Sequence, residues 1–251
     1  MINIATEQAF VIIMDHLTRK LPFCLTRFGD GEAMFLKGDK DQVDFVMKRQ
    51  LGFVPDYKDL QLITKNLMDT YHLSDMIGVS TQRHIEKKDF WAEVITIINE
   101  TGIYASVDHY CSIDIHYDFL KGGYYDMMLR DTDELYYISC RNLDQELKDH
   151  FNIKEVHSFI IPPEMAFESS YEGDRHYPDA FLKASDWIRQ HGNEGKLLLV
   201  GGGIVGKAYC AKWAMEGGVA VDIGSIFDEF AGRVTRGQGR GVDVYDETRK
   251  I

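Results

Sequence analysis

The feature that most constrains this chain is the alternation of short apolar segments with segments whose apolar residues recur at helical spacing. The short apolar segments predict strands at 22–28, 76–80, 103–107, 135–140, 156–161, 196–200 and 219–223. Helical spacing predicts helices at 6–19, 32–36, 41–50, 58–73, 90–99, 143–150, 179–191 and 206–216. Strands that alternate with helices favour a largely parallel sheet with helices on both faces, since parallel strands need crossover connections. We therefore predict an α/β fold of the Rossmann-like class, in a single domain over residues 1–251.

The composition excludes several classes of protein. Hydrophobic residues make up 45% of the 251 residues, which is enough for a full core. No segment approaches the roughly 18 consecutive apolar residues of a membrane span, and the first residues do not resemble a secretory signal. The cysteines are widely separated beside apolar residues, as expected of reduced core thiols: Cys24, Cys111, Cys140 and Cys210. These features predict a cytoplasmic protein.

The charge of the chain is unevenly distributed. A formal net charge of −12 argues against non-specific binding to nucleic acids, which basic surfaces drive. Basic residues gather instead in a Gly- and Arg-rich tail from about residue 232, which includes Arg233, Arg236 and Arg240. Such tails are usually disordered. This one could also fold over a bound diphosphate or form part of a homo-oligomer contact.

Two carboxylates and a guanidinium follow the first predicted strand, in the sequence Arg27-Phe28-Gly29-Asp30-Gly31-Glu32-Ala33. Ligands of open α/β sheets bind at the carboxyl ends of strands. Asp30 and Glu32 could both reach one hard divalent cation, and magnesium commonly bridges one or two carboxylates to substrate phosphates. Arg27 could contact a diphosphate or pair with Asp30 and hold the loop. Gly29, Gly31 and the following helix would present N–H groups to a phosphate, although a plain surface turn has the same composition.

A glycine-rich turn, Gly201–Gly206, follows the strand predicted at 196–200 and fits the pattern Gly-x-Gly-x-x-Gly. Asp222 ends the next strand, about where a dinucleotide fold has its ribose-binding acid. This pattern suggests an NAD(P)-dependent oxidoreductase. Only about 45 residues follow Gly206, which is too few for a second mononucleotide unit. Gly202 and Gly203 could instead let the backbone approach a diphosphate or a ribose, or the turn could bind nothing.

Further candidates follow other predicted strands. Arg141 follows the strand at 135–140 and could neutralise negative charge on a ligand, whereas Asn142 fits an N-cap equally well. The segment 108–131 has no clear period, and its His and Asp residues between 108 and 118 could include a general base or simply lie on the surface. Asp228 and Glu229 are predicted to be solvent-exposed.

Three stretches resemble the GT-D type of glycosyltransferase, a family first catalogued as a domain of unknown function. Residues 27–32 resemble its Asp-x-Glu motif. Residues 136–142 resemble its strand ending in Gly-Arg-Asn, with Cys140 in place of the glycine. Residues 197–203 and 221–225 resemble its last strand, glycine turn and Asp-Ile-Gly element. The matches occur in the order of the family and span nearly the whole chain.

The resemblance implies a GT-D fold and the transfer of a hexose from a nucleotide-diphosphate sugar, UDP-linked, to a glycan on a protein, lipid or polysaccharide. It implies that Asp30 and Glu32 bind Mn²⁺ or Mg²⁺ and act in catalysis with Arg141. The residues then expected to bind the sugar nucleotide are Arg27, Gly29, Gly31, Asn142, Gly202, Gly203, Asp222 and Ser225. An oxidoreductase and a non-catalytic nucleotide-sugar-binding module remain the alternatives.

Overall fold

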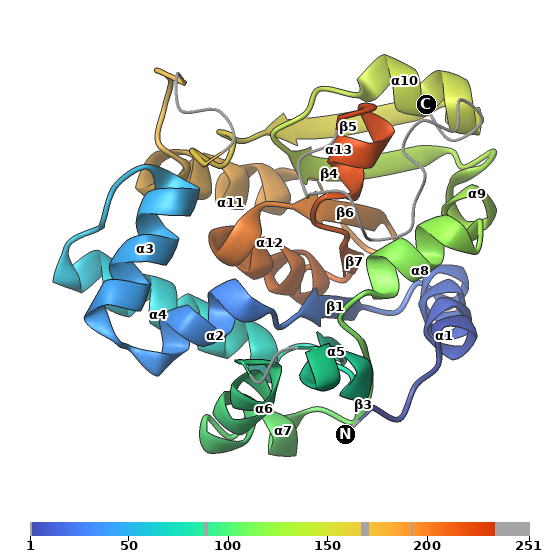
Figure 1. Ribbon diagram of the computed structural model, residues 1–251. Coiled ribbons are helices and arrows are strands. Elements are labelled where there is room, and N and C mark those ends of the chain that lie inside the picture. The colour runs from blue at the N-terminus through green and yellow to red at the C-terminus, as the bar shows by residue number, and fades with distance from the viewer. Residues whose placement is uncertain (1, 88–89, 167–170, 192, 234–251) are drawn as a thin grey trace.

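A computed structural model describes residues 2–87, 90–166, 171–191 and 193–233. Its strands form one seven-stranded sheet in the order β3-β2-β1-β7-β6-β4-β5, and every neighbouring pair is parallel (Figure 1). The strands are β1 Phe23–Arg27, β2 Met76–Val79, β3 His109–Ser112, β4 Glu134–Ser139, β5 Glu155–Ile160, β6 Leu197–Gly201 and β7 Val219–Asp222. The predicted α/β fold with a parallel sheet is confirmed.

Helices cover both faces of this sheet (Figure 1). They are α1 Thr6–Arg19, α2 Asp30–Lys37, α3 Lys40–Leu51, α4 Tyr57–His72, α5 Gln82–Lys87, α6 Phe90–Glu100, α7 Ile103–Ser106, α8 Ile115–Lys121, α9 Tyr124–Leu129, α10 Asp144–Phe151, α11 Phe181–Gln190, α12 Gly203–Met215 and α13 Ile226–Phe230. A π-helical turn, His176–Ala180, leads into α11. In the described part of the chain, no helix has the length and apolar character needed to cross a membrane.

Two apolar cores lie on opposite faces of the sheet because successive strand residues point to opposite sides. In β1, Cys24 packs into the core that includes residues of α2, α4, α6, α11 and α12, while Leu25 packs into the core with α1, α8, α9, α10 and α13. Helix α12 is apolar on nearly all sides and buries most of its length between α4, α11 and the sheet. A helix with this pattern belongs in a protein interior.

The register brings the carboxyl ends of the central strands to one level. Arg27 of β1 lies opposite Gly78, Val200 of β6 lies opposite Asp222, and Ser139 of β4 lies opposite Gly201. The chain builds outward from β1 to β3, then crosses to β4 on the other side of β1. Doubly wound sheets bind ligands at such a reversal of strand order.

The prediction of a strand at 103–107 is wrong. Residues Ile103–Ser106 form the short helix α7, and the strand β3 follows at His109–Ser112, where Tyr110 and Cys111 are buried and paired with β2. A short apolar run does not distinguish a strand from a buried helical turn, so pairing with β2 decides the position of the strand. The segment without a clear period contains β3, α8 and α9.

Candidate functional site

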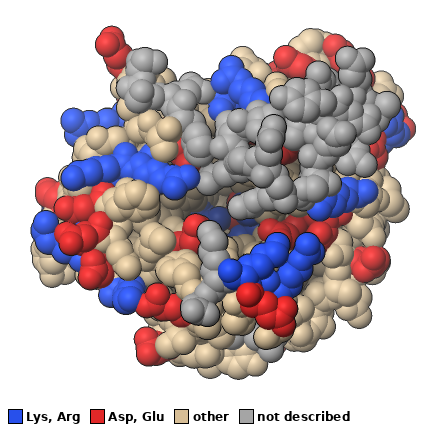
Figure 2. All heavy atoms as spheres, in the orientation of Figure 1, with Lys and Arg blue, Asp and Glu red and all other residues tan. Residues whose placement is uncertain are grey.

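A cavity of about 460 Å³ opens at the carboxyl edge of the sheet. Its walls come from the segments that follow β1, β3, β4, β5, β6 and β7, together with α5, which follows β2. Figure 2 shows Lys and Arg beside Asp and Glu around the hollow at the centre of the face in view. The predicted site residues that line the cavity are Arg27, Gly29, Asp30, Gly31, Glu32, Arg141, Gly202, Gly203, Asp222 and Ser225.

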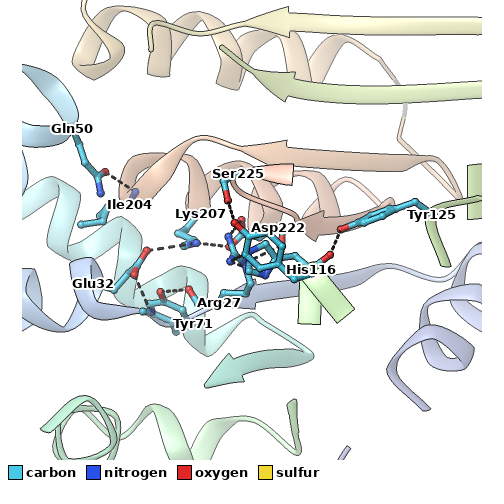
Figure 3. Close-up of polar contacts among 12 residues, drawn as sticks. Arg27, Glu32, Gln50, Tyr71, His116, Tyr125, Ile204, Lys207, Asp222 and Ser225 are labelled. Atoms are coloured by element: carbon cyan, nitrogen blue, oxygen red, sulfur yellow. Dashed lines mark hydrogen bonds and ion pairs between the residues drawn. The ribbon is translucent and has the colours of Figure 1, made fainter. Parts of the chain in front are cut away.

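Four buried charged side chains form the floor of this cavity, and we refer to Arg27, Glu32, Lys207 and Asp222 as the charge cluster (Figure 3). Arg27 Nη2 lies 3.2 Å from Asp222 Oδ1, and Arg27 Nε donates to the Asp222 carbonyl over 3.2 Å. Lys207 Nζ donates to Asp222 Oδ2 and lies 3.5 Å from Glu32 Oε1. Each side chain is at most 14% exposed. Two cations thus face two carboxylates, and the cluster is balanced in charge.

Within the charge cluster, Arg27 and Asp222 each favour the charged form of the other. Burial alone would raise the pKa of Asp222, but Arg27 and Lys207 outweigh burial and hold that pKa below its usual range. Burial alone would lower the pKa of Arg27, but the Asp222 carboxylate more than offsets this, and the pKa is raised. The carboxylate partner of Arg27 is therefore Asp222, and the sequence-based pairing of Arg27 with Asp30 is not observed.

Both the guanidinium and the backbone of Arg27 are held by neighbouring residues. The ring nitrogens of His116 lie 2.9 and 3.0 Å from Arg27 Nη1, and the Tyr71 hydroxyl donates to the Arg27 carbonyl over 3.0 Å. Gly224 has a φ of +53°, and a Cβ built on it would lie 2.0 Å from Arg27 Nη2. The glycine of the Asp-Ile-Gly sequence is therefore required both by its left-handed backbone and by the position of Arg27.

The two carboxylates of the Asp-x-Glu sequence have different surroundings. Glu32 is buried, and its Oε2 accepts from the Gly29 N–H over 2.9 Å, which caps the first turn of α2. Asp30 is exposed, and its Oδ1 accepts from the Gly31 N–H over 2.9 Å. Asp30 Oδ2 makes no hydrogen bond with a described residue. Of the two, Asp30 is the carboxylate with a freely available oxygen.

Arg141 lines the cavity from the end of β4, as predicted. Its Nε donates to Asp228 Oδ1 over 2.8 Å, and the two side chains are 9% and 16% exposed. The prediction that Asp228 is solvent-exposed is therefore wrong, because α13 brings this residue to the arginine. Asn142 does not line the cavity: it is exposed, and its Oδ1 accepts a long bond of 3.5 Å from the Asp144 N–H.

The glycine-rich turn has an occupant from elsewhere in the chain. Gln50 Oε1 accepts from the Ile204 N–H over 2.9 Å, at the N-terminus of α12. Gly203 has a φ of +60°, and a Cβ on it would lie 2.6 Å from the same oxygen. A side-chain carbonyl thus lies where the glycine pattern predicted a phosphate. Ser225 also has a partner, since its Oγ lies 2.8 Å from the Tyr117 hydroxyl.

Sequence reasoning missed several residues that the structure brings to the cavity: Gln50, His84 and Lys207. A usable signal existed for Lys207, because residues 201–207 fit Gly-x-x-x-x-Gly-Lys, the first part of a pattern found in loops that bind phosphates. No local signal existed for Gln50, which lies in an otherwise ordinary polar helix. The basic tail lies beyond residue 233, outside the described residues.

Comparisons with protein-family models and with curated proteins find no match. Solved structures do match, each with a TM-score of 0.58. One, described as the highly conserved domain of unknown function 1792 with a distinct glycosyltransferase fold, is 15% identical over 97% of this chain and 88% of that chain. Another, described as a new glycosyltransferase from Streptococcus sanguinis with the same domain, is 19% identical over 88% and 82%. The chain therefore has this glycosyltransferase fold, and the expected GT-D fold is confirmed.

Proposed function

We propose that this protein is a glycosyltransferase that moves a hexose from a nucleotide-diphosphate sugar, UDP-linked, to a hydroxyl of a glycan acceptor. The observation that carries the proposal is the joining of Arg27, Lys207 and Arg141 at one cavity, beside the N-termini of α2 and α12. Guanidinium and ammonium groups beside helix N-termini suit a diphosphate. The fold shared with glycosyltransferases supports the same reading.

The charge accounting favours a divalent cation as a further component. Arg27, Arg141 and Lys207 are each already paired with a carboxylate that is at most 16% exposed. A diphosphate beside these three would need additional positive charge. Arg83, Lys87 and Lys121 also line the cavity, and Mg²⁺ or Mn²⁺ bound by Asp30 and Glu32 would add positive charge directly at the Asp-x-Glu sequence. Hard oxygen ligands suit these ions. Asp30 fits this role best, because Glu32 already accepts from the Gly29 N–H and lies beside Lys207. Such an ion would neutralise the diphosphate as it leaves.

The residues of the chain itself would then bind and orient the donor. Arg141, held by Asp228, would donate to the leaving diphosphate. Arg27 is fixed by Asp222 and His116, so its guanidinium keeps one orientation before the donor arrives. A preorganised donor of hydrogen bonds costs little reorganisation during the reaction.

An NAD(P)-dependent oxidoreductase is the weaker candidate. The acid expected to bind a ribose, Asp222, is buried and already bonded to Arg27 and Lys207. The N-terminus of α12, where the pyrophosphate of a dinucleotide would bind, carries the amide of Gln50. Both groups would have to give up present partners to bind NAD(P).

Calorimetric titration with UDP, UDP-glucose and NADH, each with and without Mn²⁺, tests the proposal. We expect UDP-glucose to bind in the presence of Mn²⁺ and the double variant Asp30→Asn/Glu32→Gln to lose this binding. Asp41→Asn, an exposed carboxylate of α3, is the matched control and should bind as the wild type does. Binding of NADH alone would refute the proposal. Binding of UDP-glucose without any release of UDP, in water or with sugar acceptors, would favour a non-catalytic module.

A further inference from the structure

A histidine and a carboxylate form a pair on the cavity wall that the donor-binding residues leave unused. His84 of α5 lies 2.9 Å from Asp114, measured between Nε2 and Oδ2, and both line the cavity. Asp114 follows β3 at the N-cap position of α8, where an aspartate normally accepts backbone N–H bonds. Its side chain caps nothing and turns to His84 instead. Capping therefore does not account for this aspartate.

The hydrogen bonds around His84 determine which of its nitrogens carries the proton. The backbone N–H of Thr81 donates to His84 Nδ1 over 3.1 Å, so Nδ1 is an acceptor. The proton of the neutral ring is then on Nε2, which donates to Asp114 Oδ2. The ring is 16% exposed and packs edge-on against Trp91, with ring centroids 5.3 Å apart. His84 thus holds Asp114 in place and has no free basic nitrogen of its own.

Asp114 keeps one oxygen available. Its side chain is 40% exposed, and Oδ1 makes no hydrogen bond with a described residue. Arg27, Arg141 and Lys207 end β1, follow β4 and lie on α12, whereas Asp114 follows β3 and is joined by His84 to the Trp91 side of the cavity. An aromatic ring beside a carboxylate suits a sugar. The apolar face of the sugar can pack on the aromatic ring while one of its hydroxyls donates to the carboxylate.

We propose that Asp114 is the general base that activates the acceptor, with His84 as its positioning residue; the inference rests on the proposed function. The acceptor hydroxyl gives its proton to Asp114 Oδ1, and its oxygen forms a bond to the anomeric carbon of the donor. The bond from that carbon to the phosphate oxygen breaks, and the nucleoside diphosphate leaves with the electron pair. Attack on the face opposite the leaving group inverts the anomeric configuration.

Other groups in the cavity are less suited to this role. Both ring nitrogens of His116 lie about 3 Å from Arg27 Nη1, so this ring is already engaged with the guanidinium. Asp118 lies one turn beyond Asp114, on α8, and also lines the cavity, but among the described residues no hydrogen bond or ion pair joins it to a histidine. Burial raises the pKa of Asp118. Asp118 is therefore the matched comparison for Asp114.

The experiment measures UDP release from UDP-glucose, with water or with azide as the acceptor. Water must lose a proton to attack, whereas the azide anion needs no base. We expect Asp114→Asn to lower hydrolysis about 100-fold or more while UDP-glucose binding stays unchanged. Asparagine can still accept from His84 Nε2, so the fold should be preserved. With azide, the variant should release UDP at nearly the wild-type azide rate, and NMR should show β-glucosyl azide from the α-linked donor.

His84 variants separate positioning from mere folding. His84→Ala should lower kcat about 10- to 100-fold with little change in the KM for UDP-glucose, and His84→Gln, which can still donate to Asp114, should recover part of the loss. The inference is overturned if Asp114→Asn hydrolyses UDP-glucose normally, or if only Asp118→Asn shows the loss. It is also overturned if azide fails to restore turnover, or if the product is α-glucosyl azide, with the anomeric configuration retained. A wild type that fails to bind UDP-glucose would instead refute the proposed function, and the inference with it.

Discussion

Replacing Lys207 with methionine tests whether the charge cluster depends on its balance of charges. Lys207 is 5% exposed, on a helix whose other buried residues are all uncharged. Methionine matches the length of the lysine stem and can fill the same space. In the variant, Arg27 alone would face the two buried carboxylates, Asp222 and Glu32. One negative charge would then remain unmatched in the interior.

The expected loss follows from this imbalance. Removing one partner of a buried ion pair costs about 3 to 5 kcal/mol of unfolding free energy, because the other charge stays buried and unpaired. A second substitution, Glu32→Gln, removes the surplus charge, and its amide oxygen can still accept from the Gly29 N–H. We therefore expect the double variant Lys207→Met/Glu32→Gln to recover about 1 to 2 kcal/mol relative to the single variant.

Urea unfolding, followed by fluorescence of the buried Trp213, measures these free energies. Lys212→Met is the matched control, since Lys212 lies on the same helix over the Phe181 ring and makes no ion pair with a described residue. Its cost should stay below about 1 kcal/mol. The reasoning is refuted if Lys207→Met costs no more than this control, or if adding Glu32→Gln destabilises the protein further.

Three further predictions concern single residues. Burial lowers the pKa of His176 to about 4, from 6.5 for an ordinary histidine, so the unfolded chain binds the proton first and stability falls as the pH drops from 6.5 toward 4. His176→Gln should therefore remove about 2 kcal/mol of the stability loss between pH 7 and pH 5 in urea unfolding, and an unchanged loss would contradict this. Asp30→Asn should weaken Mn²⁺-dependent UDP binding at least about tenfold in calorimetry while leaving the melting temperature unchanged. Arg141→Lys keeps the charge but not the planar fork and should lower kcat about tenfold with little change in donor KM; equal activity would argue against contact with the leaving group.

The sheet could be predicted from the sequence because its signals are local. Most strands are short apolar runs, and most of the helices between them have amphipathic spacing. Their alternation indicates a parallel sheet without knowledge of strand order. The prediction failed at 103–107, where the apolar residues belong to α7. Only the pairing of β3 with β2, a contact between distant residues, distinguishes the two possibilities.

The charged residues of the site could be predicted in the same way, but the ion pairs that they form with one another could not. Parallel strands end at one edge, so Arg27, Arg141 and Asp222 were expected to meet there. The partner of Arg27 is 195 residues away in the chain, and nothing local selects Asp222 over the nearby Asp30. Sequence reasoning thus identified the charged groups and missed which of them are already neutralised. Under the proposed function, that difference is the argument for a metal ion beside the diphosphate.

Departures from local rules mark this cavity more sharply than any single motif. Lysine is rarely buried, yet Lys207 is buried in an apolar helix; aspartate at an N-cap normally caps, yet Asp114 does not; and Gly224 permits a close approach that a Cβ would block. All three residues line the same cavity at the carboxyl edge of the sheet. Burying Lys207 and leaving α8 without a side-chain cap each give up a locally better choice. Their meeting at one cavity is what a site selected for chemistry predicts and what a merely stable edge of a sheet does not.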